Sequence, residues 1–331
     1  MVSSMQRLIR RCRCPQQQPS TAVLRPWASV IPHGAPTGSN GALSTRAGAS
    51  EGGRAGGAGG RRRGGETMGV SRRGSSHHNS NVSEDELEKF RHLEKEWWNP
   101  SSKQGAGPLH SMNVTRVQYI ARQVGLFLPE ASPHKGSTTP LAGLRALDVG
   151  CGGGLLSESL ARLGAEVVGV DPSPENVAVA SAHAKGDPLT RTIRYEATTA
   201  EELETRGEQF DLVASLEVIE HVENPAEFVS SLAALTRPGG MLTLSTINRT
   251  AKSFALAIVG AEYLAGIVPV GTHDWRKFVP PEDLAAMLHA KGFPQEGMET
   301  CGLMYNPASG RWKESSGDLD VNYIMIALRG V

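Results

Sequence analysis

Short apolar runs alternate with amphipathic segments between residues 144 and 246 of this chain. The apolar runs are four to six residues long, a length typical of buried strands. They predict strands over residues 144–149, 166–170, 193–196, 210–215 and 241–246. The segments between them have helical spacing and predict helices over residues 154–163, 174–184 and 225–235. Strands separated by helices predict an α/β fold with a parallel sheet, which binds ligands at the carboxyl ends of its strands.

Helical patterns also precede the first strand. Ser83 and Glu86 form a capping-box pattern, and apolar residues at helical spacing follow it. A second helical spacing covers residues 117–124. We therefore expect the folded domain to span residues 83–331 and to open with a helical cap over residues 83–128.

The first eighty residues have a different composition. Residues 1–80 contain twelve arginines, no lysine and two acidic residues, which is a net charge of +10. Residues 1–14 form a basic amphipathic start without the continuous apolar stretch of a secretory signal. Residues 48–65 are mostly Gly, Ala and Arg and are too poor in apolar side chains to form a core. We expect residues 1–80 to be a mitochondrial transit peptide with a disordered Gly/Arg-rich linker; the alternative is an RGG-like RNA-binding tail near residues 61–63.

The zero net charge of the whole chain conceals an acidic body. Residues 81–331 contain 22 basic and 32 acidic residues, which is a net charge of −10. This sign argues against a general nucleic-acid-binding protein, because such proteins present basic surfaces to phosphate. Four cysteines in 331 residues do not form a disulfide scaffold, and no run of eighteen apolar residues lacks a charge. The body therefore has the composition of an ordinary globular domain without a spanning helix.

A glycine-rich loop follows the first predicted strand, in the stretch Asp148–Gly154. Gly150 and Gly152 fit the first two places of a dinucleotide loop, but Leu155 occupies the place of the third glycine. The chain has no Gly-Lys-Ser/Thr sequence, which excludes a P-loop. Cys151 lies in this loop without a histidine beside it in sequence, so we expect a small loop residue rather than a nucleophile.

An acidic residue follows the second predicted strand at the position expected for ribose recognition. Asp171 lies 21 residues after Gly150, and a carboxylate there can accept hydrogen bonds from both hydroxyls of an adenosyl ribose. The glycine loop with this acid predicts a ligand that contains adenosine, and the missing third glycine favours S-adenosylmethionine over NAD. The alternative interpretations are a flexible turn at the glycines and a helix N-cap at Asp171.

Two carboxylates and an imidazole follow the fourth predicted strand. Glu217, Glu220 and His221 are spaced i, i+3 and i+4, which places them on one face of a helical turn. Such a set could hold a divalent ion such as Mg²⁺, which would chelate two adjacent hydroxyls of a substrate. His221 could instead be a general base. In a third interpretation, the two glutamates only cap and solvate the turn.

An apolar stretch follows the fifth predicted strand. Residues 254–270 contain a single charge, Glu262, and the stretch is too short to span a bilayer comfortably. It could form helices that face the core. Alternatively, it could be an interfacial segment that dips into a membrane and admits a lipid tail.

Several of these stretches resemble a known family. Residues 147–154 resemble motif I of class I S-adenosylmethionine-dependent methyltransferases, and Pro238–Gly240 resembles a later motif. The chain more narrowly resembles the ubiquinone biosynthesis O-methyltransferases over about residues 83–328. The stretches that carry this narrower resemblance are Pro108–Asn113 with Arg116, Ser245–Arg249, Gly271–Trp275 with Lys277 and Phe278, Met304–Pro307, and Asp320–Tyr323.

The resemblance implies a Rossmann-like fold, with a mainly parallel seven-stranded sheet and helices on both faces. It implies methyl transfer from S-adenosylmethionine to polyprenylated catechols, including demethylubiquinol. By position, it implies cofactor binding by Arg116, Gly150, Asp171 and Leu216. It also implies a metal site at Glu217, Glu220 and His221, with Glu217 and His221 serving catalysis.

The family's substrate is lipid-soluble, which makes residues 251–279 a candidate membrane-associating insertion. We therefore expect peripheral contact with the matrix side of the mitochondrial inner membrane, a multi-subunit ubiquinone-biosynthesis complex as partner, and no nucleic acid. Three other functions remain open. They are methylation of a soluble phenol, a nicotinamide-dependent dehydrogenase, and a non-catalytic subunit of a biosynthetic complex.

Overall fold

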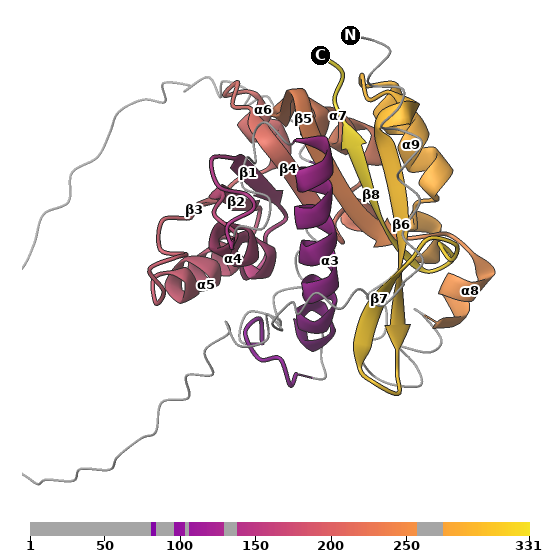
Figure 1. Ribbon diagram of the computed structural model, residues 1–331, viewed down its shortest axis with the longest axis horizontal. Coiled ribbons are helices and arrows are strands. Elements are labelled where there is room, and N and C mark those ends of the chain that lie inside the picture. The colour runs from indigo at the N-terminus through magenta and orange to yellow at the C-terminus, as the bar shows by residue number, and fades with distance from the viewer. Residues whose placement is uncertain (1–80, 84–95, 103–105, 129–137, 257–273) are drawn as a thin grey trace, which may run out of the picture. The chain divides into compact units, whose positions relative to one another are not determined.

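The computed structural model describes residues 81–83, 96–102, 106–128, 138–256 and 274–331. The centre of the described domain is an eight-stranded sheet in the order β3-β2-β1-β4-β5-β8-β6-β7 (Figure 1). The strands are β1 (Arg145–Val149), β2 (Glu166–Asp171), β3 (Arg194–Ala197), β4 (Phe210–Leu216), β5 (Thr236–Ile247), β6 (Met298–Asn306), β7 (Arg311–Ser315) and β8 (Asn322–Leu328). The first five strands are parallel to one another, and β8 pairs antiparallel with β5 and with β6.

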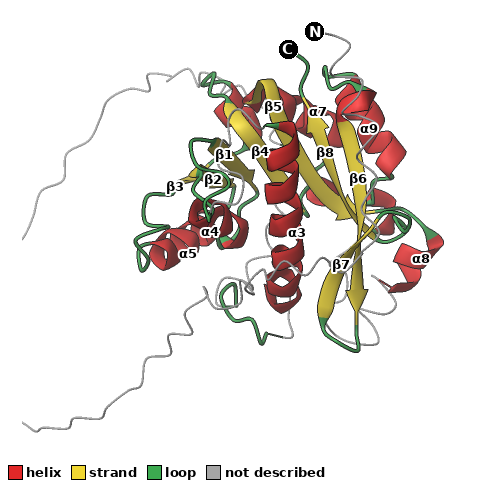
Figure 2. Cartoon of the chain, in the orientation of Figure 1, coloured by secondary structure: helices red, strands yellow, loops and turns green. Residues whose placement is uncertain are grey.

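Helices cover both faces of the sheet (Figure 2). The α-helices are α3 (Ala106–Phe127), α4 (Leu155–Arg162), α5 (Pro174–Ala184), α6 (Ala200–Glu204), α7 (Pro225–Leu235), α8 (Ala251–Ser253) and α9 (Pro281–His289). Side chains of α3 and α4 pack on one face, and side chains of α6, α7 and α9 pack on the other. The class of fold expected from the alternating pattern is confirmed.

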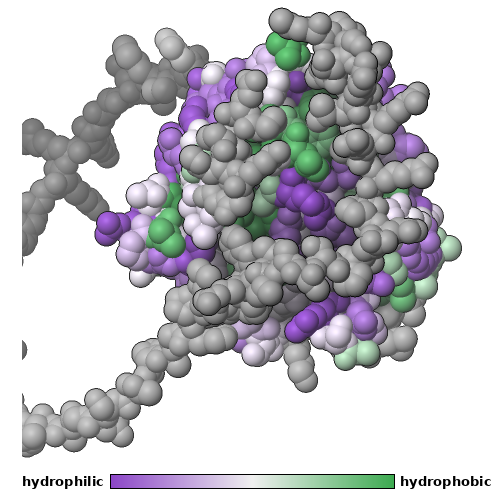
Figure 3. Space-filling view, viewed as in Figure 1, coloured by the Kyte–Doolittle hydropathy of each residue, from purple (hydrophilic) through white to green (hydrophobic). Residues whose placement is uncertain are grey.

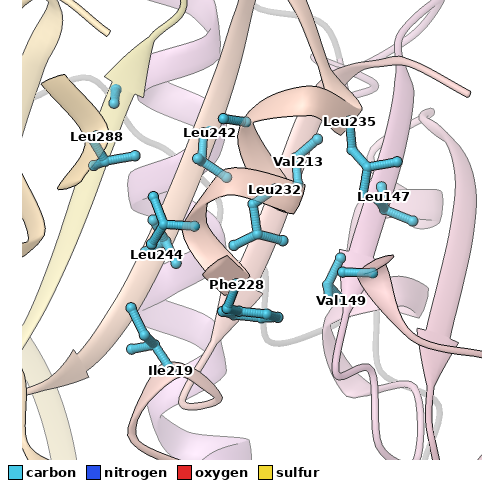
Figure 4. Close-up of a cluster of buried hydrophobic side chains, with 14 of the residues drawn as sticks. Leu147, Val149, Val213, Ile219, Phe228, Leu232, Leu235, Leu242, Leu244 and Leu288 are labelled. Carbon is cyan, nitrogen blue, oxygen red and sulfur yellow. The ribbon is translucent and has the colours of Figure 1, made fainter. Parts of the chain in front are cut away.

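The core between the sheet and α7 shows why the apolar runs form strands. Leu147 and Val149 from β1 and Val213 from β4 point toward Phe228 and Leu232 of α7 (Figure 4). Alternate residues of the same strands pack on the α3 face, so both faces of the central strands are buried. A parallel sheet buried on both faces requires nearly continuous apolar runs, and those runs are the pattern that the sequence carries.

Two sequence expectations about the sheet are corrected. The sheet has eight strands where seven were expected, because Arg311–Ser315 pairs with β6 as an additional antiparallel edge strand. Its mostly polar, partly exposed residues lack the apolar pattern of the buried strands. Strand β5 begins at Thr236, before the expected start at residue 241, since Gly239 takes a φ of 70° and donates a backbone hydrogen bond to the Arg329 carbonyl inside the sheet.

Other expected elements agree closely or lie elsewhere. Helices α5 and α7 have the bounds that their spacing predicts, whereas α3 is longer than the predicted segment over residues 117–124. The predicted helix from residue 83 falls mostly on residues 84–95, and the apolar stretch falls mostly on residues 257–273; both ranges lie outside the described residues.

The described surface and helices give no spanning segment. Within the part of the chain that the structure describes, no helix combines the length and the apolar character needed to cross a bilayer. In the coloured surface of Figure 3, hydrophobic residues form separate patches among hydrophilic ones.

Asn81 and Val82 contact the segment that follows β4. Val82 forms an antiparallel bridge with Val222. The Asn81 side chain accepts a hydrogen bond from the Asn224 amide at 2.8 Å and donates to the Asn224 carbonyl at 3.0 Å. Two residues before Ser83 are therefore packed against the segment that follows β4.

Candidate active site

The carboxyl ends of β1, β2 and β4 bring three predicted elements of the site to one edge of the sheet. Strand β1 lies between β2 and β4, and all three run parallel. The glycine loop after β1, Asp171 at the end of β2, and the segment after β4 therefore meet at this edge. The expectation of a ligand site at the strand carboxyl ends rested on this property of parallel sheets.

The glycine loop is held tightly against its neighbours. Three glycines have positive φ values, which residues other than glycine rarely adopt: 75° at Gly150, 52° at Gly152 and 89° at Gly154. A Cβ atom on Gly150 would lie 2.4 Å from the Cγ2 atom of Val218. The loop thus requires glycine both for its turns and for its close approach to the segment after β4.

Asp171 anchors this loop from the end of β2. Its Oδ2 atom accepts a hydrogen bond from the Gly152 amide at 2.9 Å, and its Oδ1 atom accepts from the Ser173 amide at 3.0 Å and from Asn176 Nδ2 at 3.1 Å. Burial raises the pKa of this carboxyl group, and these hydrogen bonds oppose the rise. The helix N-cap that was the alternative is Ser173 instead, whose hydroxyl accepts from the Asn176 amide.

Arg116 approaches the site from α3. Its side chain is buried, and its Nη1 atom lies 3.6 Å from Glu217 Oε1. Its Nε and Nη1 atoms are buried without a hydrogen-bond partner. Burial lowers the pKa of the guanidinium group, while the charges of Glu217 and Asp148 raise it. A buried cation with unpaired donors can receive a carboxylate through charge-assisted hydrogen bonds.

Glu217 has an unusual backbone conformation immediately after β4. Its φ is 59°, a left-handed value seen at no other non-glycine residue in the described ranges. Such a conformation costs about 1–2 kcal/mol and is frequent at functional sites. The Glu217 amide donates to the Ser245 carbonyl at 2.9 Å, and the Ser245 hydroxyl donates to Glu217 Oε1 at 2.6 Å. Strand β5 therefore holds the strained residue in place.

Glu220 is buried next to the same strand. Its Oε2 atom accepts a hydrogen bond from the Thr246 hydroxyl at 2.8 Å. Burial, together with the negative charge of Glu217, raises the pKa of Glu220, and the charge of His221 opposes this rise. The negative charge of Glu217 thus disfavours the ionised form of Glu220.

The expected helical turn through these residues is corrected. Only Ile219–His221 is helical, as a single 3-10 turn, and Glu217 lies outside it with a left-handed backbone. The three side chains therefore do not follow the α-helical spacing from which a common face was predicted. Over the described ranges of the chain, no three His, Cys, Asp or Glu side chains are grouped closely enough to hold a metal ion.

Two other residues considered in the sequence analysis are Leu216 and Cys151. Leu216 is the last residue of β4, is partly buried and packs against the core beneath α3. Cys151 is a buried free cysteine, and burial raises the pKa of its thiol well above the ordinary value. A thiol in that state is a poor nucleophile, which agrees with its interpretation as a small loop residue.

The structure adds site residues that the sequence analysis did not assign. Asp148 is buried, accepts a hydrogen bond from the Ser157 hydroxyl at 2.6 Å, and has its pKa raised by burial to about 6. Ser245 and Thr246 belong to the stretch that carried the family resemblance, and this stretch was the available signal for them. Trp97 and Asn176 pair over the glycine loop although they are 79 residues apart.

Comparisons with known proteins show the family of this chain. Residues 147–244 match the family model described as a methyltransferase domain. A ubiquinone biosynthesis O-methyltransferase of Cereibacter sphaeroides is 44% identical over 250 residues, covering 76% of this chain and 98% of that protein. A protein of Arabidopsis thaliana named ubiquinone biosynthesis O-methyltransferase, mitochondrial, is 49% identical over 245 residues, covering 74% of each chain.

Similarity among solved structures concerns the fold. Magnesium protoporphyrin IX methyltransferase from Synechocystis PCC 6803, solved with bound SAH, superposes with a TM-score of 0.50 at 22% identity. The match covers 73% of this chain and 97% of that one. It shows that the two chains share the same arrangement of sheet and helices.

Proposed function

This chain belongs to the family of ubiquinone biosynthesis O-methyltransferases, and we propose that it methylates a phenolic hydroxyl of polyprenylated catechols, namely polyprenyl-dihydroxybenzoate and demethylubiquinol. The observation that carries the proposal is the placement of Glu217, Glu220 and His221 directly after β4, beside the glycine loop of an S-adenosylmethionine-dependent methyltransferase.

The proposed cofactor contacts follow from the chemistry of each position. Arg116 would receive the methionine carboxylate, since two of its buried nitrogen atoms lack a partner. Asp171 would accept a hydrogen bond from a ribose hydroxyl, and Gly150 would let the cofactor lie against the backbone. Leu216 would contribute through its backbone and its apolar side chain, because it has no polar group to offer.

The proposed reaction needs a nucleophilic oxygen in line with the sulfonium methyl group. A bond forms between the phenolic oxygen and the methyl carbon while the bond from sulfur to that carbon breaks, which leaves the thioether S-adenosylhomocysteine. A phenol has a pKa near 10, so little of the reactive phenolate exists at neutral pH unless the site favours loss of the proton. In the route without a metal, His221 would accept this proton as a general base. Glu217 would orient the reacting group.

A divalent cation such as Mg²⁺ is part of the proposal. Two carboxylates and an imidazole are a ligand set that such a cation accepts. A positive charge there would relieve the repulsion from Glu217, which together with burial raises the pKa of Glu220. When bound, the cation lowers the pKa of a coordinated hydroxyl group. Glu217, Glu220 and His221 would hold it, which requires their side chains to come closer together than they lie in the described structure. The rival route has His221 acting as base without a metal.

The proposal extends to location and partners. The basic composition of residues 1–80 and the mitochondrial relative from Arabidopsis thaliana support import into mitochondria. The apolar character of residues 254–270 and a lipid-soluble substrate support peripheral contact with the matrix side of the inner membrane. A multi-subunit ubiquinone-biosynthesis complex would pass such substrates between enzymes without releasing them.

One experiment tests the substrate and the metal together. The purified full chain is incubated with labelled S-adenosylmethionine and either a polyprenylated dihydroxybenzoate or a short soluble catechol, in the presence of EDTA or after restoration of Mg²⁺. We expect methylation of the prenylated substrate, loss of turnover in EDTA and recovery with Mg²⁺. Glu217→Gln and Glu220→Gln should then be nearly as damaging as His221→Ala, while Glu223→Gln serves as the matched control.

The other outcomes identify the rival functions. Full activity in EDTA, with only His221→Ala reducing the rate by about 10²–10⁴-fold, assigns the base route instead. Preference for the soluble catechol overturns the prenylated substrate. Absence of any methyl transfer favours a non-catalytic subunit.

A further inference from the structure

The aromatic side chain of Trp97 lies directly on the glycine loop. A Cβ atom on Gly152 would lie 2.5 Å from the Trp97 ring, and a Cβ atom on Gly153 would lie 2.4 Å from it. Trp97 is buried and packs with Leu155, the first residue of α4. These two glycines therefore admit an indole ring from a segment that precedes the whole sheet in sequence.

The segment around Trp97 is fixed in this position by several contacts. The Trp98 indole donates a hydrogen bond to the Gly153 carbonyl at 2.9 Å and stacks on His183, with ring centroids 3.4 Å apart. His110 Nε2 lies 2.8 Å from the Trp97 carbonyl oxygen. Trp97 is thus held from α3, from α5 and from the loop that it covers.

A chain of hydrogen bonds connects Trp97 with the acid at the end of β2. The Trp97 indole donates to Asn176 Oδ1 at 2.9 Å, and Asn176 Nδ2 donates to Asp171 Oδ1 at 3.1 Å. All three residues are buried. Asn176 can serve both partners only with its amide in one orientation, and Trp97 enforces that orientation because an indole N–H only donates.

The carboxylate of Asp171 is nearly saturated by these contacts. A carboxylate has about four acceptor positions, and the Gly152 amide, the Ser173 amide and Asn176 occupy three of them. Oδ1 accepts two of these hydrogen bonds, so the remaining position is on Oδ2, next to the glycine loop. The direction in which Asp171 can accept a further hydrogen bond is therefore determined by its protein partners.

We propose that Trp97 and Asn176 are positioning residues, which orient the Asp171 carboxylate so that its free acceptor position faces the ribose of the cofactor. This inference rests on the proposed role of Asp171 in ribose binding. Orienting a buried side chain before the ligand arrives removes the cost of ordering it during binding, which corresponds to about 2- to 12-fold in affinity for one side chain.

The test measures S-adenosylhomocysteine binding to the full chain by calorimetry, together with kcat and KM for S-adenosylmethionine. Asn176→Ala should weaken binding by about 2- to 12-fold. Trp97→Phe keeps an aromatic ring in place and loses only the indole donor. It should raise the Kd by a smaller factor than Asn176→Ala. In both variants KM should rise while kcat at saturating cofactor stays near the wild-type value, which a general loss of structure would not produce.

The double variant and the control separate positioning from other effects. If Trp97 acts through Asn176, adding Trp97→Phe to Asn176→Ala should cause no further loss of affinity. Trp312→Phe is the matched control, because its indole donates to the Ser111 hydroxyl at 3.2 Å without touching the glycine loop. If Asn176→Ala does not fold, Trp97→Phe alone still decides the result.

Two results overturn the inference and differ in their reach. Asp171→Asn with unchanged affinity overturns both the ribose role and the positioning. Suppose instead that Asp171→Asn weakens binding, while Asn176→Ala and Trp97→Phe either leave the affinity unchanged or cause losses that add in the double variant. This result overturns the positioning only.

Discussion

Replacing Arg116 with lysine should weaken binding only of ligands that carry the amino-acid carboxylate. The Nε and Nη1 atoms of Arg116 are buried without partners, so the guanidinium group has donors available for charge-assisted hydrogen bonds to a carboxylate. Lysine keeps the positive charge near Glu217 but supplies a single point of contact. Loss of one hydrogen bond between charged groups is about 1.5–3 kcal/mol, or about 12- to 150-fold in Kd.

Calorimetry with two ligands makes this prediction specific. S-adenosylhomocysteine contains the carboxylate, whereas 5′-methylthioadenosine has the same ribose and adenine without it. Arg116→Lys should weaken the first ligand by the stated factor and leave the second within about twofold. The control is Arg122→Lys, a neighbouring residue of α3 whose side chain is partly exposed and paired with Glu314.

The reasoning about Arg116 is refuted by either of two results. Wild-type affinity of Arg116→Lys for S-adenosylhomocysteine would mean that the unpaired nitrogen atoms do not meet the carboxylate. An equal loss for both ligands would mean that the substitution disturbs the site as a whole, rather than one contact.

Three further outcomes follow from the packing of the domain. In urea titrations, Gly150→Ala should lower the free energy of unfolding by about 1–2 kcal/mol because of its positive φ, and by about 1–3 kcal/mol more because of the steric clash. Gly207→Ala, at a φ of 69° with open space around it, should show the first loss alone. A chain that begins at Asn81 should be about 2 kcal/mol more stable than one two residues shorter, because the shorter chain loses hydrogen bonds to the segment after His221; equal melting curves would contradict this. Burial raises the pKa of Asp148 from 3.8 to about 6, so the unfolded chain releases this proton first and stability falls by about 3 kcal/mol as the pH rises from about 3 to about 7. Asp148→Asn should lack this fall, and parallel stability profiles of variant and wild type over that pH window would disprove the assignment.

The short-range features of this protein could be predicted from the sequence. The bounds of α5 follow from Pro174 at its start and from the apolar spacing that continues to Ala184, and the structure has the same bounds. The glycine loop and Asp171 were also identified, because tight turns and a strand-end acid depend on residues close together in the chain. Parallel strands then place these elements at one edge of the sheet, whatever the details of packing.

Contacts between distant segments were decided only by the tertiary structure. The backbone of Glu217 is left-handed because Ser245, on the neighbouring strand, holds both its amide and its side chain. A local helical periodicity contains no information about that strand, so the three ligand-type residues were placed on one helical face that does not form. In the same way, Trp97 reaches Asn176 only because α3, α5 and the glycine loop pack together. Such pairs are specified by the shape of the whole core, which no spacing along the chain records.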